Sequence, residues 1–237
     1  RFQATKMAIH AAMVDRIDQE LGRVFQQLRE MGALENTLIL FLSDNGASSE
    51  LMIRDDGHDP QAEPGSADTH LCLGPGWSTA CNTPFRKHKT WVHEGGIATP
   101  MIAHWPAKIR DAGQLRHQVA HVIDLLATCL DLAGIQRPAS APSAPSFPGR
   151  SLVAAIESDQ SIDRPWLWWS HENNQAIRMA GWKAVKTSAG DWELYYLPQD
   201  RTEQNDLAES NPARLAELVA QWTKTQEQFV RDASLEE

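Results

Sequence analysis

The sequence predicts an α/β domain followed by a small antiparallel sheet that packs with a C-terminal helix. A long amphipathic helix pattern leads directly into a short, continuously apolar run at residues 38–42, and this order is typical of α/β domains. After residue 165, short β-like runs alternate with turn residues and end in a second long helical pattern. With 237 residues, the chain can form one large domain or two modest ones.

The first predicted element is a helix that ends near Gly32. Its apolar side chains recur at intervals of three and four residues: Met7, Val14, Ile17, Leu21, Val24, Leu28 and Met31. The apolar run at 38–42 does not alternate with polar residues, so we expect a central parallel strand that is covered on both faces. The chain has no initiator methionine and starts almost directly in the helix, so we expect it to begin inside a larger protein.

The middle of the chain is predicted to contain a long loop, a second strand and a second helix. Residues 46–83 are rich in Gly, Pro, Asp and Ser, and a loop of this length is usually functional or disordered. The run Ile97–Trp105 predicts a strand interrupted by Pro100. The pattern from Val119 to Ala133 predicts a helix.

A stretch rich in Pro, Ala and Ser, residues 137–150, is predicted to be an extended linker. It would separate the α/β part, residues 1–136, from a C-terminal α+β subdomain, residues 151–237. Four short β-like runs in this subdomain predict an antiparallel sheet: Trp166–Ser170, Gln175–Met179, Trp182–Lys186 and Trp192–Leu197. The pair Asn211-Pro212 then marks the start of the closing helix.

Composition and charge argue against several classes of function. The net charge of −9 disfavours a nucleic-acid partner, because such proteins neutralise phosphates with basic side chains. No stretch approaches the apolar length of a membrane span. The three cysteines, Cys72, Cys81 and Cys129, form neither a disulfide framework nor a paired zinc motif. We therefore expect a soluble globular protein without a nucleic-acid partner.

The apolar run at 38–42 ends at Ser43 and is followed by Asp44, Asn45 and Gly46. Asp-Asn-Gly is common turn chemistry, and on local sequence alone a turn is the better explanation. The alternative is a metal site, because ligands of open α/β sheets bind beyond the carboxyl ends of the strands. Asp and Asn oxygens are hard donors that suit Ca²⁺ or Mg²⁺.

A second candidate segment, Phe85–Pro100, combines basic side chains with two adjacent glycines. Four cationic or imidazole side chains lie from Arg86 to Lys89, and His93-Glu94-Gly95-Gly96 follows. A lysine beside a hard cation is suited to neutralising a tetrahedral oxyanion. The alternative is a solvated basic turn before a strand, which is the better explanation for this segment in isolation.

Taken together, these segments resemble the sulfatase family of the alkaline phosphatase-like superfamily. The matches follow the order of the family: LILFLSDNG, TPFRKHKTWVHEGGIATPMIAHWP, HVIDLLATCLDLAGI, PGRSL, AIRMAGWKAVK and WELYYLPQDRTEQNDLAESNP. The segment around Lys89 is most similar to bacterial arylsulfatases. The resemblance implies an alkaline phosphatase-like fold, in which this chain supplies part of a mixed, mostly parallel sheet flanked by helices. It leaves the compartment open between the bacterial cytoplasm and periplasm.

The resemblance also implies roles for three residues. Asp44 and Asn45 match the pair that coordinates the active-site cation, usually Ca²⁺ rather than Mg²⁺. Lys89, five residues before Glu94, matches the lysine that contacts the substrate sulfate. The cation and Lys89 would together bind the sulfate oxygens and stabilise charge in the transition state. The implied activity is hydrolysis of a small-molecule sulfate ester, as in arylsulfatases.

The family's nucleophile, a formylglycine made from Cys or Ser in a C/S-x-P-S/A-R motif, has no match in this chain. The stretch from Cys81 to Arg86 places its proline one position too late. The family's early aspartate pair, its Lys-x-His pair and its upstream histidine also lack counterparts. We therefore expect roughly the C-terminal half of a sulfatase, which is inactive alone and needs the missing N-terminal half.

Two other functions stay open from the sequence. A phosphonate or phosphate ester hydrolase of the same superfamily would use the same cation and lysine, and a non-catalytic fragment would keep the fold without turnover. The organic part of the substrate is not identified, although the loop 47–80, with Trp77, is the best candidate to contact it. His93, His104 and His171 are expected in structural or rim roles. Five tryptophans are expected in the core between sheet and closing helix: Trp166, Trp168, Trp169, Trp182 and Trp192.

Overall fold

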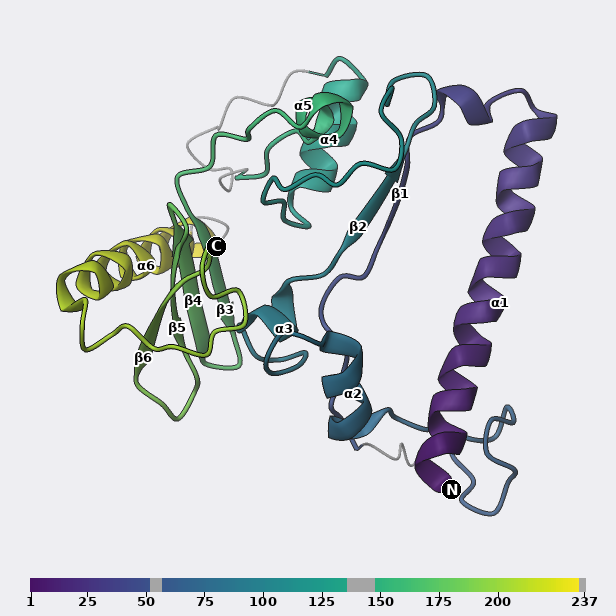
Figure 1. The fold of residues 1–237 in the computed structure, drawn as a ribbon, viewed down its shortest axis with the longest axis horizontal. Helices are drawn as coiled ribbons and strands as arrows, with labels where there is room; N and C mark the ends of the chain where they lie inside the picture. Colours follow the sequence, from purple (N-terminus) through teal and green to yellow (C-terminus); the bar gives the residue numbers. More distant parts are fainter. Residues whose placement is uncertain (52–56, 136–147, 235–237) are drawn as a thin grey trace.

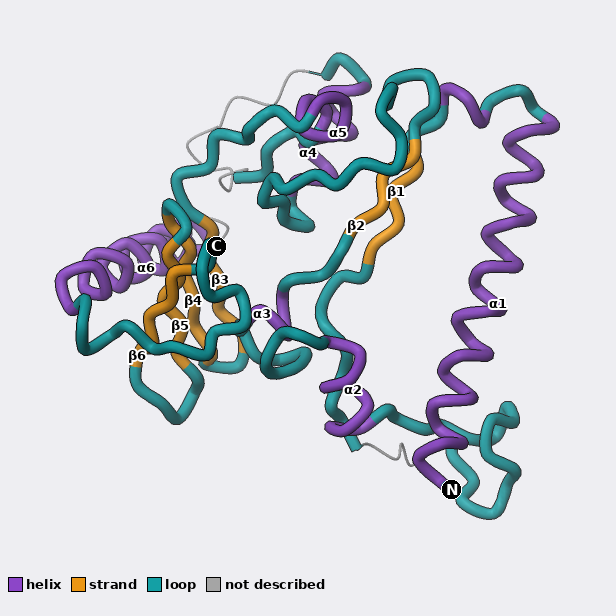
Figure 2. Tube along the Cα trace, in the orientation of Figure 1, coloured by secondary structure: helices purple, strands orange, loops and turns teal. Residues whose placement is uncertain are grey.

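The computed structural model describes residues 1–51, 57–135 and 148–234, and Figure 1 shows how its elements are arranged. The helices are α1 (Phe2–Glu30), α2 (Gly74–Asn82), α3 (Glu94–Ile97), α4 (Asp124–Leu132), α5 (Val153–Ser158) and α6 (Pro212–Ala233), with a short 3₁₀ turn, η1 (Leu34–Asn36). The strands are β1 (Ile39–Leu42), β2 (Met101–His104), β3 (Leu167–His171), β4 (Asn174–Met179), β5 (Trp182–Lys186) and β6 (Trp192–Tyr196). Loops make up much of the chain between β1 and β3 (Figure 2).

The long N-terminal helix predicted from the apolar periodicity is confirmed as α1, and Gly32, with a φ of +67°, follows its end. Near the start of the helix, Lys6 Nζ donates to Leu73 O at 2.6 Å, and η1 contacts the opposite, C-terminal end of the helix. Between these contacts the helix stands clear of the other elements (Figure 1). Five of its apolar side chains are more than half exposed: Phe2, Met13, Val14, Ile17 and Val24. Amphipathic helices are stabilised mainly by packing of their apolar face. The apolar face of α1 is largely exposed, so it is available to pack against further polypeptide.

β1 and β2 form a two-stranded antiparallel pair, with Ile39 opposite His104 and Leu42 opposite Met101. The prediction of a parallel strand is therefore wrong for this pair, and no parallel pair occurs among the described residues. A continuous apolar run indicates burial but not strand direction. The chain leaves β1 at Leu42 and enters β2 at Met101, which lies opposite Leu42, so the two strands run antiparallel. Phe41 and Ile102, which lie opposite each other, are 51% and 63% exposed. That β1 and β2 belong to a larger, mixed and mostly parallel sheet stays a prediction.

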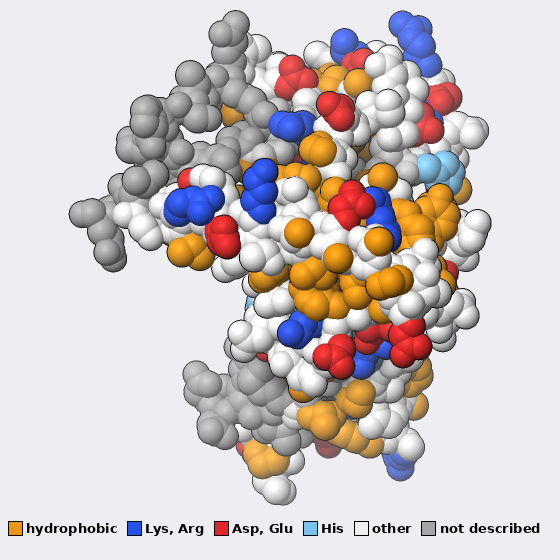
Figure 3. Space-filling view, turned by 90° about the vertical axis from the view of Figure 1, so that its left-hand side faces the viewer, with side chains coloured by type: hydrophobic (Ala, Val, Ile, Leu, Met, Phe, Trp, Pro, Cys, Tyr) orange, Lys and Arg blue, Asp and Glu red, His pale blue; other side chains and the backbone are white. Residues whose placement is uncertain are grey.

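The predicted antiparallel sheet and closing helix are confirmed: four strands pair in the order β3-β4-β5-β6, and α6 packs on one face. On that face, Leu218 and Trp222 of α6 pack against Ile177, Ala184 and Leu194 of the sheet. Four of the five tryptophans pack around this cluster, as predicted: Trp166, Trp168, Trp182 and Trp192. Figure 3 views the molecule from the side of this sheet and α6. On that surface, acidic and basic side chains are interspersed around a band of hydrophobic ones.

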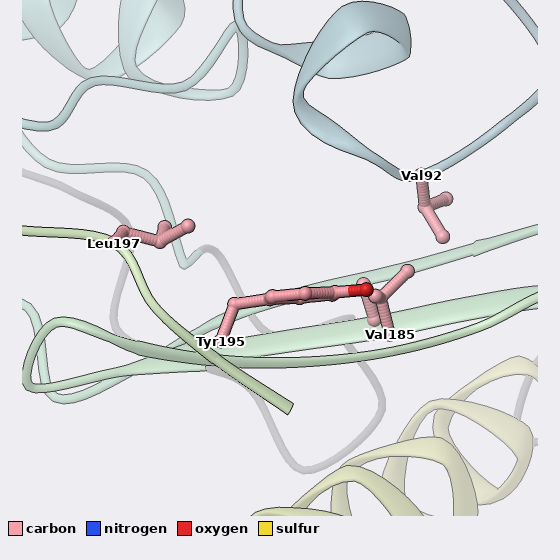
Figure 4. Packing of buried hydrophobic residues seen from close by; sticks show 5 residues of the cluster. Val92, Val185, Tyr195 and Leu197 are labelled. Carbon is pink, nitrogen blue, oxygen red and sulfur yellow. The ribbon is translucent and has the colours of Figure 1, made fainter. Parts of the chain in front are cut away.

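The other face of the C-terminal sheet packs against the loop that precedes α3. Val92 of this loop contacts a buried cluster formed by Ala176, Val185, Tyr195 and Leu197 (Figure 4). Trp169, which was expected on the α6 side, packs against this second cluster because its neighbour Trp168 takes the α6 side. The sheet therefore has a core on both faces, and one of these cores holds the segment Phe85–Pro100.

Two boundary predictions are changed by the structure. The predicted loop 46–83 contains α2, a helix whose first turn carries a proline. The predicted strand Ile97–Trp105 is shorter, because α3 precedes Pro100 and β2 begins after it. Residues 137–147 of the predicted linker lie outside the described residues, so the division into 1–136 and 151–237 stays a prediction. No helix in the described parts of the chain has the length and apolar character needed to cross a membrane.

Candidate functional site

The two candidate segments, which are far apart in the sequence, meet directly in the structure. Gly46 N donates to Gly96 O at 2.9 Å, and Lys89 N donates to Ala47 O at 3.1 Å. Gly46 is buried against Gly95, and a Cβ on Gly46 would lie 1.8 Å from Gly95 O. Only glycine allows so close an approach of two backbones. The residues that follow β1 and those around Lys89 therefore form one unit.

Asp44 and Asn45 lie at the edge of this unit. Asp44 is exposed, and its carboxylate has no hydrogen bond or ion pair among the described residues. Asn45 Nδ2 donates to Gly46 O at 2.9 Å. The side-chain oxygen Oδ1 of Asn45 has no hydrogen-bond partner among the described residues. The backbone of Ser43 is held by Thr99, whose Oγ1 donates to Ser43 O at 2.8 Å. Two hard oxygen donors are thus presented on a fixed backbone.

This donor pair fits a hard cation such as Ca²⁺ as part of a site. Carboxylate and amide oxygens are suitable ligands, and neither is taken by a competing side chain in the described chain. Ca²⁺ takes roughly six to eight oxygen ligands. The described residues contain no group of three or more His, Cys, Asp or Glu side chains that could complete the shell. Further ligands are therefore required.

Lys89 belongs to a loop with an unusual backbone. Lys87 and Thr90, on either side of it, have φ angles of 71° and 86°, which are rare for residues other than glycine and most unusual for a β-branched threonine. The side chain of Lys89 is 41% exposed, and its Nζ lies 3.4 Å from Glu50 Oε1. An exposed ion pair of this length contributes little. The ammonium group is therefore available to an anionic ligand.

The C-terminal end of α2 supports the same loop, a contact that the sequence interpretation missed. Asn82 Oδ1 accepts Ala47 N at 2.8 Å, and Asn82 Nδ2 donates to Lys87 O at 3.2 Å. Ser78 Oγ lies within hydrogen-bond distance of His88 Nδ1, at 2.8 Å. Burial, and then the charge of Lys87, lowers the pKa of His88 below its ordinary value. Asn82 thus links the chain after Gly46 to the chain before Lys89.

Glu94, the glutamate of the Glu-Gly-Gly motif, is buried in an ion cluster that the sequence interpretation did not predict. Lys183 Nζ lies 3.0 Å from Glu94 Oε1 and 2.8 Å from Glu203 Oε1. Arg201 contacts Glu94 Oε2 at 3.0 Å. Burial opposes ionisation of Glu94, but the positive charges of Lys183 and Arg201 outweigh it and lower the pKa of Glu94. We name this set, Glu94, Lys183, Arg201 and Glu203, the Lys183 cluster.

A second polar network joins the loop to β6. His93 is fully buried, as its expected structural role requires, and its Nε2 lies 3.2 Å from Glu193 Oε2. The Tyr195 hydroxyl donates to Glu193, and Arg86 NH1 donates to the Tyr195 hydroxyl oxygen at 2.8 Å. The hydrogen bond from His93, together with those of Tyr195 and the charge of Arg86, lowers the pKa of Glu193 to about 2.

Four other residues considered in the sequence take no part in this unit. His104 is exposed at the end of β2, and His171 is exposed on β3 beside Glu172. Cys81 is exposed near the end of α2. Trp77, the proposed substrate contact, donates from Nε1 to Gln3 O at 2.8 Å and so ties α2 to the start of α1.

Comparisons with known proteins identify the family of the chain. Residues 3–135 match the family model for sulfatases, and residues 85–231 match the model for the C-terminal region of N-sulphoglucosamine sulphohydrolase. An uncharacterized sulfatase of Schizosaccharomyces pombe is 30% identical over 259 alignment positions. The alignment covers 93% of this chain and 43% of that protein. N-acetylgalactosamine-6-sulfatase of Mus musculus is 30% identical over 183 residues, covering 77% of this chain and 30% of the enzyme.

A solved structure gives the same result at the level of the fold. The crystal structure of Ps i-CgsB in complex with k-i-k-neocarrahexaose superposes on 92% of this chain with a TM-score of 0.71 and 25% identity, and the match covers 43% of that chain. The chain therefore spans less than half the length of these relatives. Since the sulfatase family model alone matches more than half of the sequence, the chain belongs to the sulfatase family.

Proposed function

We propose that this chain is part of a sulfuric ester hydrolase of the arylsulfatase type. In this proposal Asp44 and Asn45 are oxygen ligands of Ca²⁺, and Lys89 binds the ester sulfate. The observation that carries the proposal is the direct contact between the two segments, through Gly46 and Gly96 and through Lys89 and Ala47. This contact, in a chain of the sulfatase family, brings Asp44, Asn45 and Lys89 to one backbone unit, which supports the proposed roles.

The chain's own residues account for binding of the anion. The net charge of −9 creates a field that repels a sulfate ester, so local positive charge is needed at the site. The half-exposed ammonium of Lys89 supplies one such charge without first breaking a strong ion pair. Asp44 and Asn45 would hold the cation, which would polarise the sulfate oxygens when bound. The nucleophile, a formylglycine by resemblance to the family, would come from polypeptide outside this chain.

The surface of the chain supports the need for additional polypeptide. The apolar stripe of α1 is exposed, and so are Phe41 of β1 and Ile102 of β2, which lie opposite each other. A sheet of two short strands also has two open edges. We attribute these surfaces to contacts with the N-terminal part of a complete sulfatase, and we expect the chain alone to be inactive.

The test is an assay of the purified chain with 4-nitrophenyl sulfate, alone and after co-expression with the N-terminal part of the same protein. We expect turnover only in the co-expressed sample, and loss of turnover after chelation of the cation. Turnover by the chain alone would show that the inactivity proposal is wrong.

The same assay separates the alternative functions. The cation and Lys89 suit any tetrahedral oxyanion, so a phenyl phosphonate monoester is tested beside the sulfate ester. Faster turnover of the phosphonate would identify a phosphonate hydrolase instead. No Ca²⁺ binding by calorimetry, even in the co-expressed sample, would favour a non-catalytic fragment.

A further inference from the structure

We propose that Lys183 and Glu203 of the C-terminal subdomain are positioning residues for the cation and sulfate segment. They fix α3, and through α3 they fix the backbone of residues 44–47. The functional consequence rests on the proposed roles of Asp44, Asn45 and Lys89, whereas the structural coupling does not.

The first step is the burial of the Lys183 cluster between three separate pieces of chain. Lys183 comes from β5, Glu203 from the turn after β6 and Glu94 from α3, and the first two side chains are fully buried. A buried lysine is retained only when carboxylates compensate its charge, so removal of one partner leaves an unpaired charge in the interior. Glu203 adopts a φ of 56°, an uncommon conformation that is kept only where surrounding contacts fix it. The cluster therefore has a defined geometry.

The second step is the attachment of α3 to this cluster through its backbone. Glu203 Oε2 accepts the amide of Glu94 at 2.8 Å, so one carboxylate binds both Lys183 and the first residue of α3. Arg86 adds a third point, since its NH1 donates to Glu203 O at 2.8 Å while its own carbonyl accepts Gly95 N at 3.0 Å. The position of Gly95 is therefore determined by contacts with the C-terminal subdomain.

The third step carries the position of α3 to the candidate ligands. Gly95 O and Gly96 O both face Gly46, one in tight contact and one as the acceptor of its amide. Gly96 is also enclosed, because a Cβ there would lie 1.9 Å from Trp91 O. These are contacts between backbones, with no flexible side chain between them to absorb a displacement. A shift of α3 must therefore move Gly46 and the adjoining Asp44 and Asn45.

The experiment compares Lys183→Met and Glu203→Gln with Lys186→Met in the 237-residue chain. Lys186 lies on the same strand as Lys183 but is partly exposed and makes no ion pair among the described residues. Glu203→Gln keeps an acceptor for the Glu94 amide and is the milder change if Lys183→Met folds poorly. The main measurement is hydrogen exchange at the amides of Gly46 and Lys89, with the β4–β5 amides as an internal reference.

We expect exchange at the Gly46 and Lys89 amides to rise roughly tenfold in Lys183→Met, less in Glu203→Gln, and not at all in Lys186→Met, while the reference amides change far less. Unchanged exchange at Gly46 and Lys89 would overturn the proposal. An equal rise at all amides would also overturn it, because that result indicates only a general loss of stability.

A second measurement, Tb³⁺ luminescence, tests the functional consequence. In the co-expressed sample, Tb³⁺ is expected to bind roughly tenfold more weakly in Lys183→Met than in Lys186→Met. If the unmodified co-expressed protein does not bind Tb³⁺, the proposed cation site is wrong, and the exchange data still decide whether Lys183 and Glu203 position Gly46. If Lys183→Met and Lys186→Met bind Tb³⁺ equally well while exchange at Gly46 is raised in Lys183→Met, the structural coupling holds. The proposed effect of Lys183 on the ligands Asp44 and Asn45 would then be wrong.

Discussion

Gly46 and Gly95 are packed so closely that a methyl group on Gly46 would lie 1.8 Å from the Gly95 carbonyl oxygen. The contact joins the turn after β1 to the Glu-Gly-Gly turn, which lie far apart in the sequence. It explains why both turns need glycine at these positions, since any side chain would push the two backbones apart. The same contact sets the separation between Asp44 and the loop that carries Lys89.

The first prediction concerns this contact. Gly46→Ala should lower the free energy of unfolding by about 1–3 kcal/mol, because the methyl group can be accommodated only by moving backbone. Urea denaturation of the purified chain measures the change. The matched control is Gly22→Ala in α1, where no atom other than those of the adjoining helix backbone lies within 4 Å of the added methyl group. The control should be neutral or stabilising by up to about 1 kcal/mol, as expected for alanine in a helix. Equal stability of Gly46→Ala and the parent chain would contradict the prediction.

The second prediction separates the cation site from the fold. In the co-expressed protein, Asp44→Asn should weaken Ca²⁺ binding by roughly tenfold or more, because it removes the negatively charged ligand. The free energy of unfolding without Ca²⁺ should stay within about 0.5 kcal/mol, since Asp44 is exposed and has no polar partner in the described chain. Calorimetry and urea denaturation measure the two effects. Asp18→Asn, an exposed change on α1, is the control and should alter neither quantity. Unchanged Ca²⁺ affinity in Asp44→Asn would remove Asp44 from the site.

The third prediction concerns the lysine. Lys89→Ala in the co-expressed enzyme should lower kcat/KM for the sulfate ester by roughly a hundredfold, because it removes a charge that stabilises the anion. Its effect on stability should be small, since the ion pair with Glu50 is exposed on both sides. Lys108→Ala is the control, because Lys108 makes a similar exposed pair with Glu157. A similar loss of kcat/KM in both variants would show that Lys89 has no specific role.

The outcome of sequence-based prediction varied with the kind of contact involved. Local patterns predicted α1, the antiparallel sheet and α6, because apolar spacing and turn residues are local signals. Strand direction at β1 was not predictable from an apolar run. The Lys183 cluster was missed because a lysine in a short strand is normally exposed, and its partner Glu94 lies 89 residues away. The buried role of Lys183 depends on packing between two parts of the chain, which no local pattern reports.

Glu193 provides a pH-dependent contribution to the attachment of the loop. Its pKa is lowered to about 2, first by the hydrogen bond from His93 and then by those of Tyr195 and the charge of Arg86. In the unfolded chain the carboxyl group returns to its ordinary pKa of 4.5. A carboxyl group with a lowered pKa in the folded state stabilises the protein fully above its unfolded pKa. This contribution is lost as the pH falls from about 4.5 toward about 2, because the folded state must then take up a proton.

The last prediction follows from this sign. Glu193→Gln cannot titrate, so the variant should be less stable than the parent chain at pH 7, and the difference should shrink as the pH falls below about 4.5. Urea denaturation of both proteins at several pH values measures it. Glu209→Gln is the control, since Glu209 is exposed, and its difference from the parent should not depend on pH in this way. Because other carboxyl groups such as Glu94 titrate equally in both proteins, their effects cancel in the difference. A constant difference between parent and Glu193→Gln from pH 7 to pH 3 would show that the bond between His93 and Glu193 does not stabilise the loop.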